Sequence, residues 1–240
     1  ADFIPEFKDG EKSKITIRHL MMMSSGLDWN EGYSSLTSQV TEAYYGTELY
    51  KQVTSLGVAE VPGKFWEYKS CDSELLAIIV NKATGKSVAA YASEKLWKPL
   101  GAEHSAQWSL DHKERKKKAY CCFYSNARDF ARFGKLMLQH GRWNDTQIID
   151  SAFIHQCITP NNLPNKEDNK PVQHYGYQWW LSNISNHPVY YMRGILGQYV
   201  IVIPDMQMII VRLGHKRSNN PDGKPNDYKF YAEQVIKMFE

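Results

Sequence analysis

The sequence lacks several features that would point to particular classes of protein. No apolar run approaches the ~20 residues of a membrane-spanning helix, and no signal peptide is recognisable. The formal net charge is only +3, so nothing indicates nucleic acid or an anionic membrane as a partner. The histidines do not have the spacing of metal ligands. We therefore expect no metal, no membrane span and no nucleic-acid partner.

Cysteine is scarce, with four residues in the chain. Cys121 and Cys122 are adjacent, which fits no common disulfide or zinc spacing. We predict that all four cysteines, Cys71 and Cys157 included, are buried or partly buried free thiols.

The composition is that of a folded protein. Hydrophobic residues make up 42% and aromatic residues 13% of the 240 positions, which is enough for a sizeable core and excludes a disordered or fibrous class. The basic run at 112–118 is predicted to be a solvated loop, with a binding patch as the alternative. Length and composition together favour a single domain over 1–240, without repeats or long linkers.

Helices dominate the first two thirds of the chain. Apolar periodicity and capping residues predict helices over the following ranges: 14–27, 72–86, 87–101, 125–141, 150–158 and 226–239. Asn126 and Asp129 resemble a capping box, and the helix near residue 72 has Ser70 or Asp72 as its candidate N-cap.

Strands are concentrated late in the sequence. Runs rich in β-branched and aromatic residues predict strands at 175–182, 188–194, 198–204 and 207–214, with a hairpin at Pro204 and Asp205 between the last two. The order indicates an α+β fold in which helices cover an antiparallel sheet. Residues from about 1 to 170 are expected to be mainly helical, and residues from about 171 to 240 to form the sheet and a closing helix.

Six stretches occur in the order typical of one known family: "ITIRHLMMMSSGLDW", "PGKFWEYKSCDSELLAIIVNKATGKS", "LWKPLGA", "FYSNARDFARFGKLMLQHG", "YGYQWWL" and "MRGILGQYVIVIPDMQMIIV". Together they resemble the serine β-lactamase and penicillin-binding-protein superfamily, in its class C-like branch of esterases and 6-aminohexanoate-dimer hydrolases. The resemblance implies a β-lactamase/transpeptidase-like fold, an antiparallel sheet flanked by helices with a helical subdomain. It implies no cofactor.

The resemblance assigns a role to "YKS" at 68–70. Tyr68 matches the family's proton-transferring tyrosine, and Ser70 matches the third position of the same motif. A tyrosine with an ordinary pKa near ~10 needs a nearby cation to act as a phenolate. Tyr68 could instead be a packing residue, and Ser70 could be a helix N-cap.

The family's Lys/His-Thr-Gly motif is replaced here by Met192, Arg193 and Gly194. Gly194 matches the position where backbone approaches the ligand. Met192 cannot replace a cation, and Arg193 could supply charge only if its side chain reached the cleft, although neighbouring strand residues face opposite ways. This departure favours esters or amides over β-lactams.

Three further positions match residues around the substrate cleft of relatives. Tyr33 lies in the loop after Gly26, Tyr124 lies at the start of the 125–141 helix, and Gln198 follows the Gly194 motif. We predict that Tyr33, Tyr124, Arg193, Gly194 and Gln198 bind the substrate.

The family's nucleophile is the serine of Ser-x-x-Lys, and no serine of this sequence has lysine three residues later. "ADFIPEF" at 1–7 resembles a family segment that follows this motif, so the nucleophile helix and first strands are expected upstream of residue 1. Three interpretations follow. The chain is the larger part of a serine hydrolase whose other part is a separate or lost segment; or it is a non-catalytic relative that binds a ligand or partner; or it is an inactive remnant.

The implied substrate is a small ester, amide or β-lactam-like molecule. Family resemblance favours the periplasm or cell envelope of a bacterium, while the sequence does not predict the oligomeric state.

Overall fold

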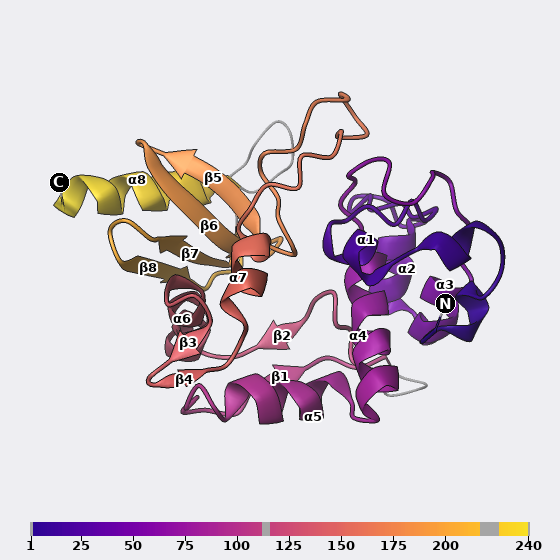
Figure 1. Ribbon diagram of the computed structural model, residues 1–240, viewed down its shortest axis with the longest axis horizontal. Coiled ribbons are helices and arrows are strands. Elements are labelled where there is room, and N and C mark those ends of the chain that lie inside the picture. The colour runs from indigo at the N-terminus through magenta and orange to yellow at the C-terminus, as the bar shows by residue number, and fades with distance from the viewer. Residues whose placement is uncertain (1, 112–115, 217–225, 240) are drawn as a thin grey trace. The chain divides into compact units, whose positions relative to one another are not determined.

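The computed structural model describes residues 2–111, 116–216 and 226–239. The chain forms two compact units (Figure 1). Unit 1 comprises 1–94, 106–124 and 161–172, and unit 2 comprises 95–105, 125–160 and 173–240.

Unit 1 is mainly helical. Its elements are η1 (Pro5–Phe7), η2 (Gly10–Lys14), α1 (Ile17–Met21), α2 (Gln39–Tyr45), α3 (Leu49–Thr54), α4 (Ser70–Thr84), α5 (Val88–Ala92), β1 (Gln107–Trp108) and β2 (Phe123–Tyr124). A further helical turn, η3 (Ser93–Trp97), leads into unit 2. The longest helix, α4, buries Cys71, Leu75 and Ile78, which recur at the i, i+4, i+7 spacing of one helix face. They pack in a core with residues of α1, α2 and α3.

The predicted helix at 14–27 is much shorter in the structure. Thr16 caps α1 by accepting from the His19 amide, and α1 ends at Met21. Met23 has a φ of 55°, which stops the helix, and the Ser24 amide and hydroxyl bond to the His19 carbonyl instead. Gly26 has a φ of 72°, and a Cβ there would lie 2.1 Å from the Glu60 carbonyl oxygen, so only glycine fits this turn.

Unit 2 contains a four-stranded antiparallel sheet of order β5–β6–β7–β8. Its strands are β5 (Trp180–Ile184), β6 (His187–Arg193), β7 (Tyr199–Ile203) and β8 (Met208–Arg212). The prediction of a late antiparallel sheet with helices is confirmed, although β5 begins five residues later than expected. The central strand β7 is buried at every position, because helices cover both of its faces.

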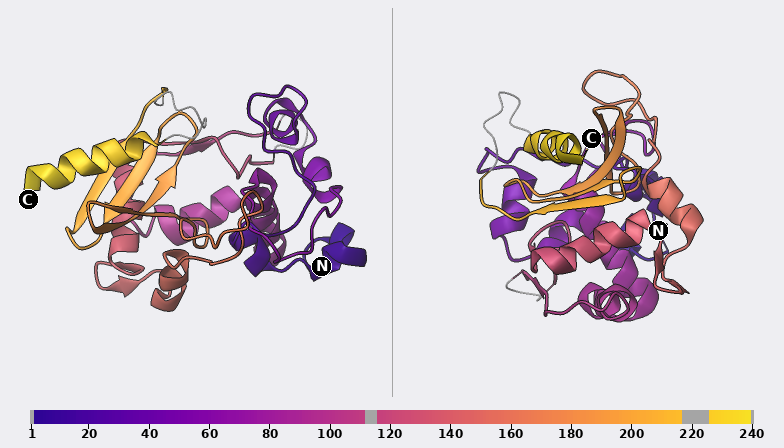
Figure 2. Two further views of the ribbon diagram at one scale, coloured as in Figure 1. Left: turned by 90° about the horizontal axis from the view of Figure 1, so that it is seen from above. Right: turned by 90° about the vertical axis from the view of Figure 1, so that its left-hand side faces the viewer.

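Three helices accompany this sheet: α6 (Ala127–Leu138), α7 (Ser151–Cys157) and α8 (Asp227–Phe239). A small hairpin, β3 (Arg142–Trp143) and β4 (Thr146–Gln147), follows α6. Helix α8 lies on one face of the sheet and α6 on the other (Figure 2). Residues that pair directly across strands share a face, so Trp180, Tyr191 and Ile201 face α8, whereas Tyr190 and Val202 face α6 and α7.

At the start of α6, Asn126 is confirmed as the N-cap of the predicted capping box, and the Asp129 carboxylate bonds to the Asn126 side chain. The Asn126 side chain accepts from the Asp129 amide at 2.9 Å. Asp129 is fully buried and accepts from the Asn126 side chain, the Glu103 and His104 amides and Arg132 Nε, at 2.7–3.2 Å. Burial opposes the charge of Asp129, but these hydrogen bonds outweigh it and lower the pKa. Asp129 thus fixes the loop at 103–104 to α6.

The basic run is only partly solvated. Lys116 is exposed, but Lys118 is buried, donates to the Tyr44 carbonyl and lies 5.3 Å above the Tyr44 ring. The prediction of a solvated loop is therefore wrong at Lys118, and residues 112–115 of that prediction lie outside the described part of the chain.

Candidate active site

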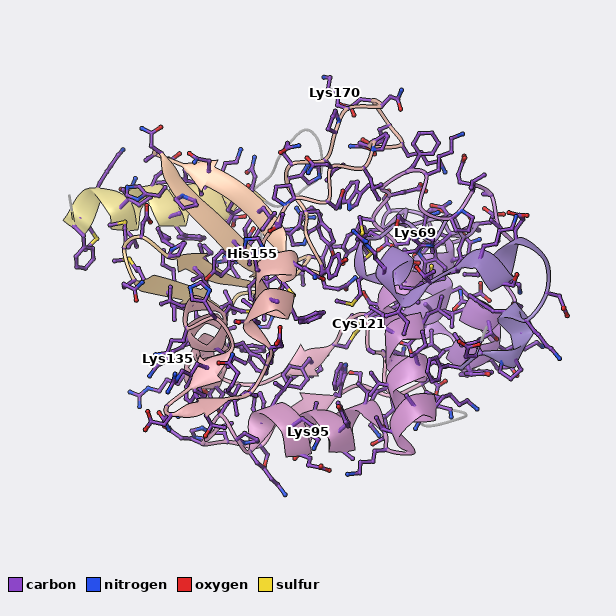
Figure 3. The ribbon with its side chains drawn as sticks, viewed as in Figure 1. Lys69, Lys95, Cys121, Lys135, His155 and Lys170 are labelled. Atoms are coloured by element: carbon purple, nitrogen blue, oxygen red, sulfur yellow. A yellow bond between two sulfur atoms is a disulfide. The ribbon has the colours of Figure 1, made fainter. Side chains whose placement is uncertain are left out.

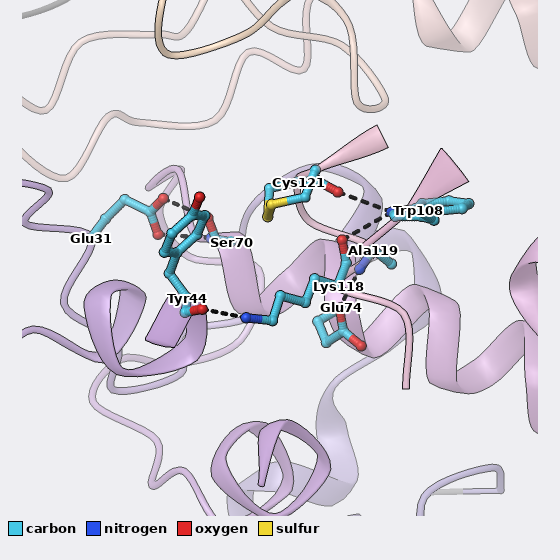
Figure 4. The surroundings of a disulfide bond; sticks show 9 residues. Glu31, Tyr44, Ser70, Glu74, Trp108, Lys118, Ala119 and Cys121 are labelled. Atoms are coloured by element: carbon cyan, nitrogen blue, oxygen red, sulfur yellow. Dashed lines mark hydrogen bonds between the residues drawn. A yellow bond between two sulfur atoms is a disulfide. The ribbon is translucent and has the colours of Figure 1, made fainter. Parts of the chain in front are cut away.

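The start of α4 carries the residues that the sequence analysis singled out. Ser70 is the first residue of the helix, and the N-cap is Lys69, whose side chain makes no capping hydrogen bond. The predicted N-cap at Ser70 or Asp72 is therefore wrong. Instead, the Glu31 carboxylate accepts from the Ser70 amide at 2.8 Å and from the Ser70 hydroxyl at 2.6 Å (Figure 4). A carboxylate from another segment thus satisfies an amide that the helix leaves unpaired.

Glu31 also joins two aromatic side chains to this position. Trp29 Nε1 donates to Glu31 Oε2 at 2.5 Å, and the Tyr33 hydroxyl donates to Glu31 Oε1. Glu31 is not among the site residues predicted from the sequence. It lies 39 residues from Ser70 in a loop, and no spacing pattern links a loop carboxylate to a helix start so far along the chain.

Tyr33 and Tyr68 belong to the same cluster. About half of the Tyr33 side chain is exposed, but its hydroxyl is directed at Glu31. Desolvation, the Glu31 charge and the neighbouring Tyr68 raise the pKa of Tyr33 strongly. Tyr33 therefore keeps its proton at neutral pH and acts as a hydrogen-bond donor. Tyr68 is half-buried.

Lys69 lies between Tyr68 and Ser70 in unit 1 (Figure 3), and it is buried. Its Nζ donates to the Leu27 carbonyl and lies 2.8 Å from Glu67 Oε2. Glu67 also pairs with Lys166 at 3.0 Å. Burial opposes ionisation of Glu67, but the hydrogen bonds and charges of these two lysines outweigh it and lower the pKa. Lys69 thus holds the segments around Leu27 and Glu67 together.

Tyr124 lies on β2, not at the start of α6 as predicted, and its side chain is exposed. It follows a disulfide between the adjacent residues Cys121 and Cys122 (Figure 4). The prediction of free thiols is therefore wrong for this pair, whereas Cys71 and Cys157 are free and buried as expected. Trp108 Nε1 donates to the Lys118 and Cys121 carbonyls at 3.0 and 2.9 Å, which anchors the turn before Tyr124.

The other predicted substrate residues lie in unit 2, around the turn between β6 and β7. The Gly194 amide donates to the Gln198 carbonyl at 2.8 Å, and a Cβ on Gly194 would lie 2.3 Å from Gln198 Oε1. The Gln198 side chain accepts from the Leu196 amide at 3.2 Å and donates to the Gly214 carbonyl. Gly194 thus leaves room for the Gln198 side chain, which braces the turn.

Met192 and Arg193 point to opposite faces of the sheet. Met192 packs in the cluster on the α6 and α7 face. The Arg193 guanidinium lies 3.7 Å from the centre of the Trp180 ring on the α8 face. The two adjacent residues therefore contribute differently, one to apolar packing and the other to a cation–aromatic contact.

The described residues contain no group of three or more His, Cys, Asp or Glu side chains that could hold a metal ion. Within the same ranges, no helix has the length and apolarity needed to cross a membrane.

The β-lactamase family model matches residues 1–231. The chain belongs to the β-lactamase family. Among curated relatives it is similar to the 6-aminohexanoate-dimer hydrolase of Paenarthrobacter ureafaciens, with 24% identity over 231 residues, 89% of this chain and 58% of that protein.

Two solved structures share the fold of this β-lactamase-family chain. A putative 6-aminohexanoate-dimer hydrolase from Bacillus anthracis has a TM-score of 0.81 at 24% identity, covering 99% of this chain and 64% of that one. A putative β-lactamase from Bacteroides dorei has a TM-score of 0.72 at 19% identity, covering 98% and 75%. The predicted family and the α+β fold with its antiparallel sheet are confirmed. The chain spans less than two thirds of the length of the two 6-aminohexanoate-dimer hydrolases.

Proposed function

We propose that this chain belongs to a serine hydrolase that cleaves small esters or amides through an acyl-enzyme. The observation that carries the proposal is the cluster at the start of α4, where Ser70 and Tyr33 share the Glu31 carboxylate and Tyr68 lies beside Tyr33. The family match makes serine-based acyl transfer the reaction to expect of such a cluster.

The nucleophile of this reaction is a serine outside these 240 residues, since none of their serines has a lysine three positions later. Its hydroxyl oxygen attacks the carbonyl carbon, and the bond to the leaving group breaks as the acyl-serine forms. Tyr68, held as a phenolate by a cation such as the lysine of Ser-x-x-Lys, accepts the serine proton and passes it to the leaving group. Tyr68 then takes a proton from water, which attacks the acyl-serine, and returns it to the serine oxygen as the acid leaves. The raised pKa of Tyr33 suits it to donate a hydrogen bond rather than to accept the proton.

The sheet residues support esters or amides over β-lactams as substrates. A β-lactam presents a carboxylate, which a nearby cation would bind. Met192 provides no charge and packs in the sheet core, and the Arg193 guanidinium stacks on Trp180. We therefore expect activated esters to acylate the protein faster than benzylpenicillin does. Comparable rates with the two reagents would count against this preference.

Tyr68→Phe tests the proton relay in the complete gene product. Removing the phenol oxygen is expected to lower kcat for a p-nitrophenyl ester by ~10²-fold, the scale of general-base loss. Tyr45→Phe is the matched control, because Tyr45 is an exposed residue of α2 with no bond to the cluster. An unchanged rate in Tyr68→Phe, with an unchanged melting curve, would exclude the relay.

The absence of Ser-x-x-Lys from these residues favours a second candidate, a non-catalytic ligand-binding protein. A fluorophosphonate probe followed by peptide mapping separates the two. Labelling of a single serine in the complete gene product supports the hydrolase. Saturable, reversible ester binding without any labelled serine supports the binding protein.

A further inference from the structure

We propose that Glu31 is the positioning residue of this site and that it sets the orientation of Ser70 and Tyr33 for the reaction. The inference rests on the proposed function and adds to it a residue that the motif does not contain.

Glu31 accepts hydrogen bonds from four donors. Its Oε1 accepts from the Ser70 and Tyr33 hydroxyls, and its Oε2 accepts from the Ser70 amide and the Trp29 indole. A carboxylate has about four acceptor sites, so these donors fill them. Glu31 therefore has no spare lone pair with which to take a proton or bind a substrate cation, and it acts through the groups that it holds.

Glu31 also fixes the direction of the Ser70 hydroxyl. Its proton points to Glu31 at an oxygen–oxygen distance of 2.6 Å. The lone pairs of Ser70 Oγ are then the part of this hydroxyl that a neighbouring donor can reach. Hydrogen bonds to a charged acceptor are stronger than neutral ones, so this orientation is well fixed.

Glu31 further attaches the first residue of α4 to the loop that contains Tyr33. The Ser70 amide is at the positive end of the helix dipole, and Glu31 provides the negative charge there. Because Tyr68 precedes Ser70 by two residues, the same contact limits how far the Tyr68 backbone can move. One carboxylate thus links the loop that carries Tyr33 to the segment that carries Tyr68.

The test compares Glu31→Gln with Asp28→Asn in the complete gene product. Glutamine keeps the shape of the side chain but replaces one carboxylate oxygen by an NH2 group. Because NH2 is a donor, the two groups that donate to that oxygen lose their acceptor. Asp28→Asn removes a carboxylate three residues away that is exposed. We expect kcat for an activated ester to fall about 10- to 100-fold in Glu31→Gln with little change in KM, the scale of a misplaced reacting group, and no change in Asp28→Asn.

A double-mutant cycle separates positioning from a general loss of folding. If Glu31 acts through Ser70, the effects of Glu31→Gln and Ser70→Ala on log kcat are less than additive. Additive effects, or an unchanged kcat in Glu31→Gln, would overturn the proposal. Should Glu31→Gln fail to fold, Glu31→Asp, which shortens the side chain by one methylene, replaces it in the same cycle.

The Ser70 amide gives a readout that does not need turnover. Hydrogen exchange at this amide should accelerate at least tenfold in Glu31→Gln and stay unchanged in Asp28→Asn. If the wild type shows no ester hydrolysis but this acceleration occurs, the proposed function fails while Glu31 still positions Ser70. If exchange is unchanged, the positioning role fails whatever the activity.

Discussion

At the scale of single residues, two buried carboxyl groups lie just after Ser70 on α4. Asp72 is fully buried, and its Oδ2 has no hydrogen-bond partner among the described residues. Glu74 accepts from the Ala119 amide at 2.7 Å and faces Asp111 and Lys118. Burial raises the pKa of Asp72 to about 7 and of Glu74 to about 8, and hydrogen bonds offset only part of this shift.

Because the pKa values of Asp72 and Glu74 are raised in the folded state, we expect these two groups to lower the free energy of unfolding as the pH rises. Between the unfolded pKa values near ~4 and the folded values, the native state binds more protons than the unfolded state. The free energy of unfolding therefore falls by up to about 1.4 kcal/mol per pH unit for each group. The decline should end above pH 8, where both groups are ionised in the native state as well.

Urea unfolding between pH 5 and 9 measures this slope. Glu74→Gln should flatten it, whereas Glu11→Gln, at an exposed carboxylate, should leave it unchanged. A stability that rises with pH over this range would refute the assignment.

The cysteines make a second prediction at this scale. Iodoacetamide added to the unfolded, unreduced chain should modify two cysteines, Cys71 and Cys157, and after reduction it should modify four. Intact mass decides the count. Four modified cysteines without reductant would show that Cys121 and Cys122 are not bonded.

At the scale of elements, α6 approaches the sheet closely at Gly134. A Cβ there would lie 2.9 Å from Ile209 Cγ2 and 3.1 Å from Val200 Cγ1. Glycine in a helix costs about 1 kcal/mol relative to alanine, so its presence here reflects the contact with β7 and β8.

Gly134→Val is therefore expected to destabilise the protein by about 2 kcal/mol, because overpacking forces the helix away from the sheet. Arg128→Val, at an exposed position of the same helix, measures what valine costs in helix stability where no packing clash occurs. Chemical denaturation compares the two. Equal losses would mean that α6 has room at residue 134.

Local sequence patterns were sufficient to predict some of these elements but not others. The late strands and α6 follow from local signals: apolar runs, turn residues and the Asn126 cap. The helix at 14–27 was predicted too long because its apolar residues continue past Met21. The positive φ of Met23 and the bonds from Ser24 to the His19 carbonyl end it, and Gly26 then turns close to the Glu60 carbonyl. The free-thiol prediction failed because spacing rules do not anticipate a bond between neighbouring cysteines.

At the scale of the whole molecule, the motif order predicted the family whose model matches residues 1–231. Tyr33, Tyr68 and Ser70 lie in one cluster, and the roles assigned to them stay predictions. Glu31 and Lys69 could not be predicted, since their contacts join segments about 40 residues apart. Such contacts depend on tertiary packing and leave no periodic trace in the sequence.

A prediction about ester hydrolysis also belongs to the scale of the whole molecule. The 240-residue chain alone should hydrolyse p-nitrophenyl esters no faster than buffer, since it has no Ser-x-x-Lys serine to acylate. Spectrophotometry of released p-nitrophenol tests this, with the complete gene product as the comparison. Turnover by the chain alone that survives further purification would assign the nucleophile to one of its own serines.

Met192 and Arg193 lie on opposite faces of β6. The face that carries the Arg193 charge is therefore fixed by the same strand register that packs the hydrophobic core. A slip of one residue between β6 and β7 would exchange the faces of the two side chains. The same slip would turn Tyr191 away from Tyr228 and Tyr190 away from Val202, reversing the packing of both sheet faces. The charge at 193 therefore cannot move to the opposite face by sliding the strand. A cation at this point of the α6 and α7 face therefore requires a substitution of Met192 itself, which is a change of a single codon.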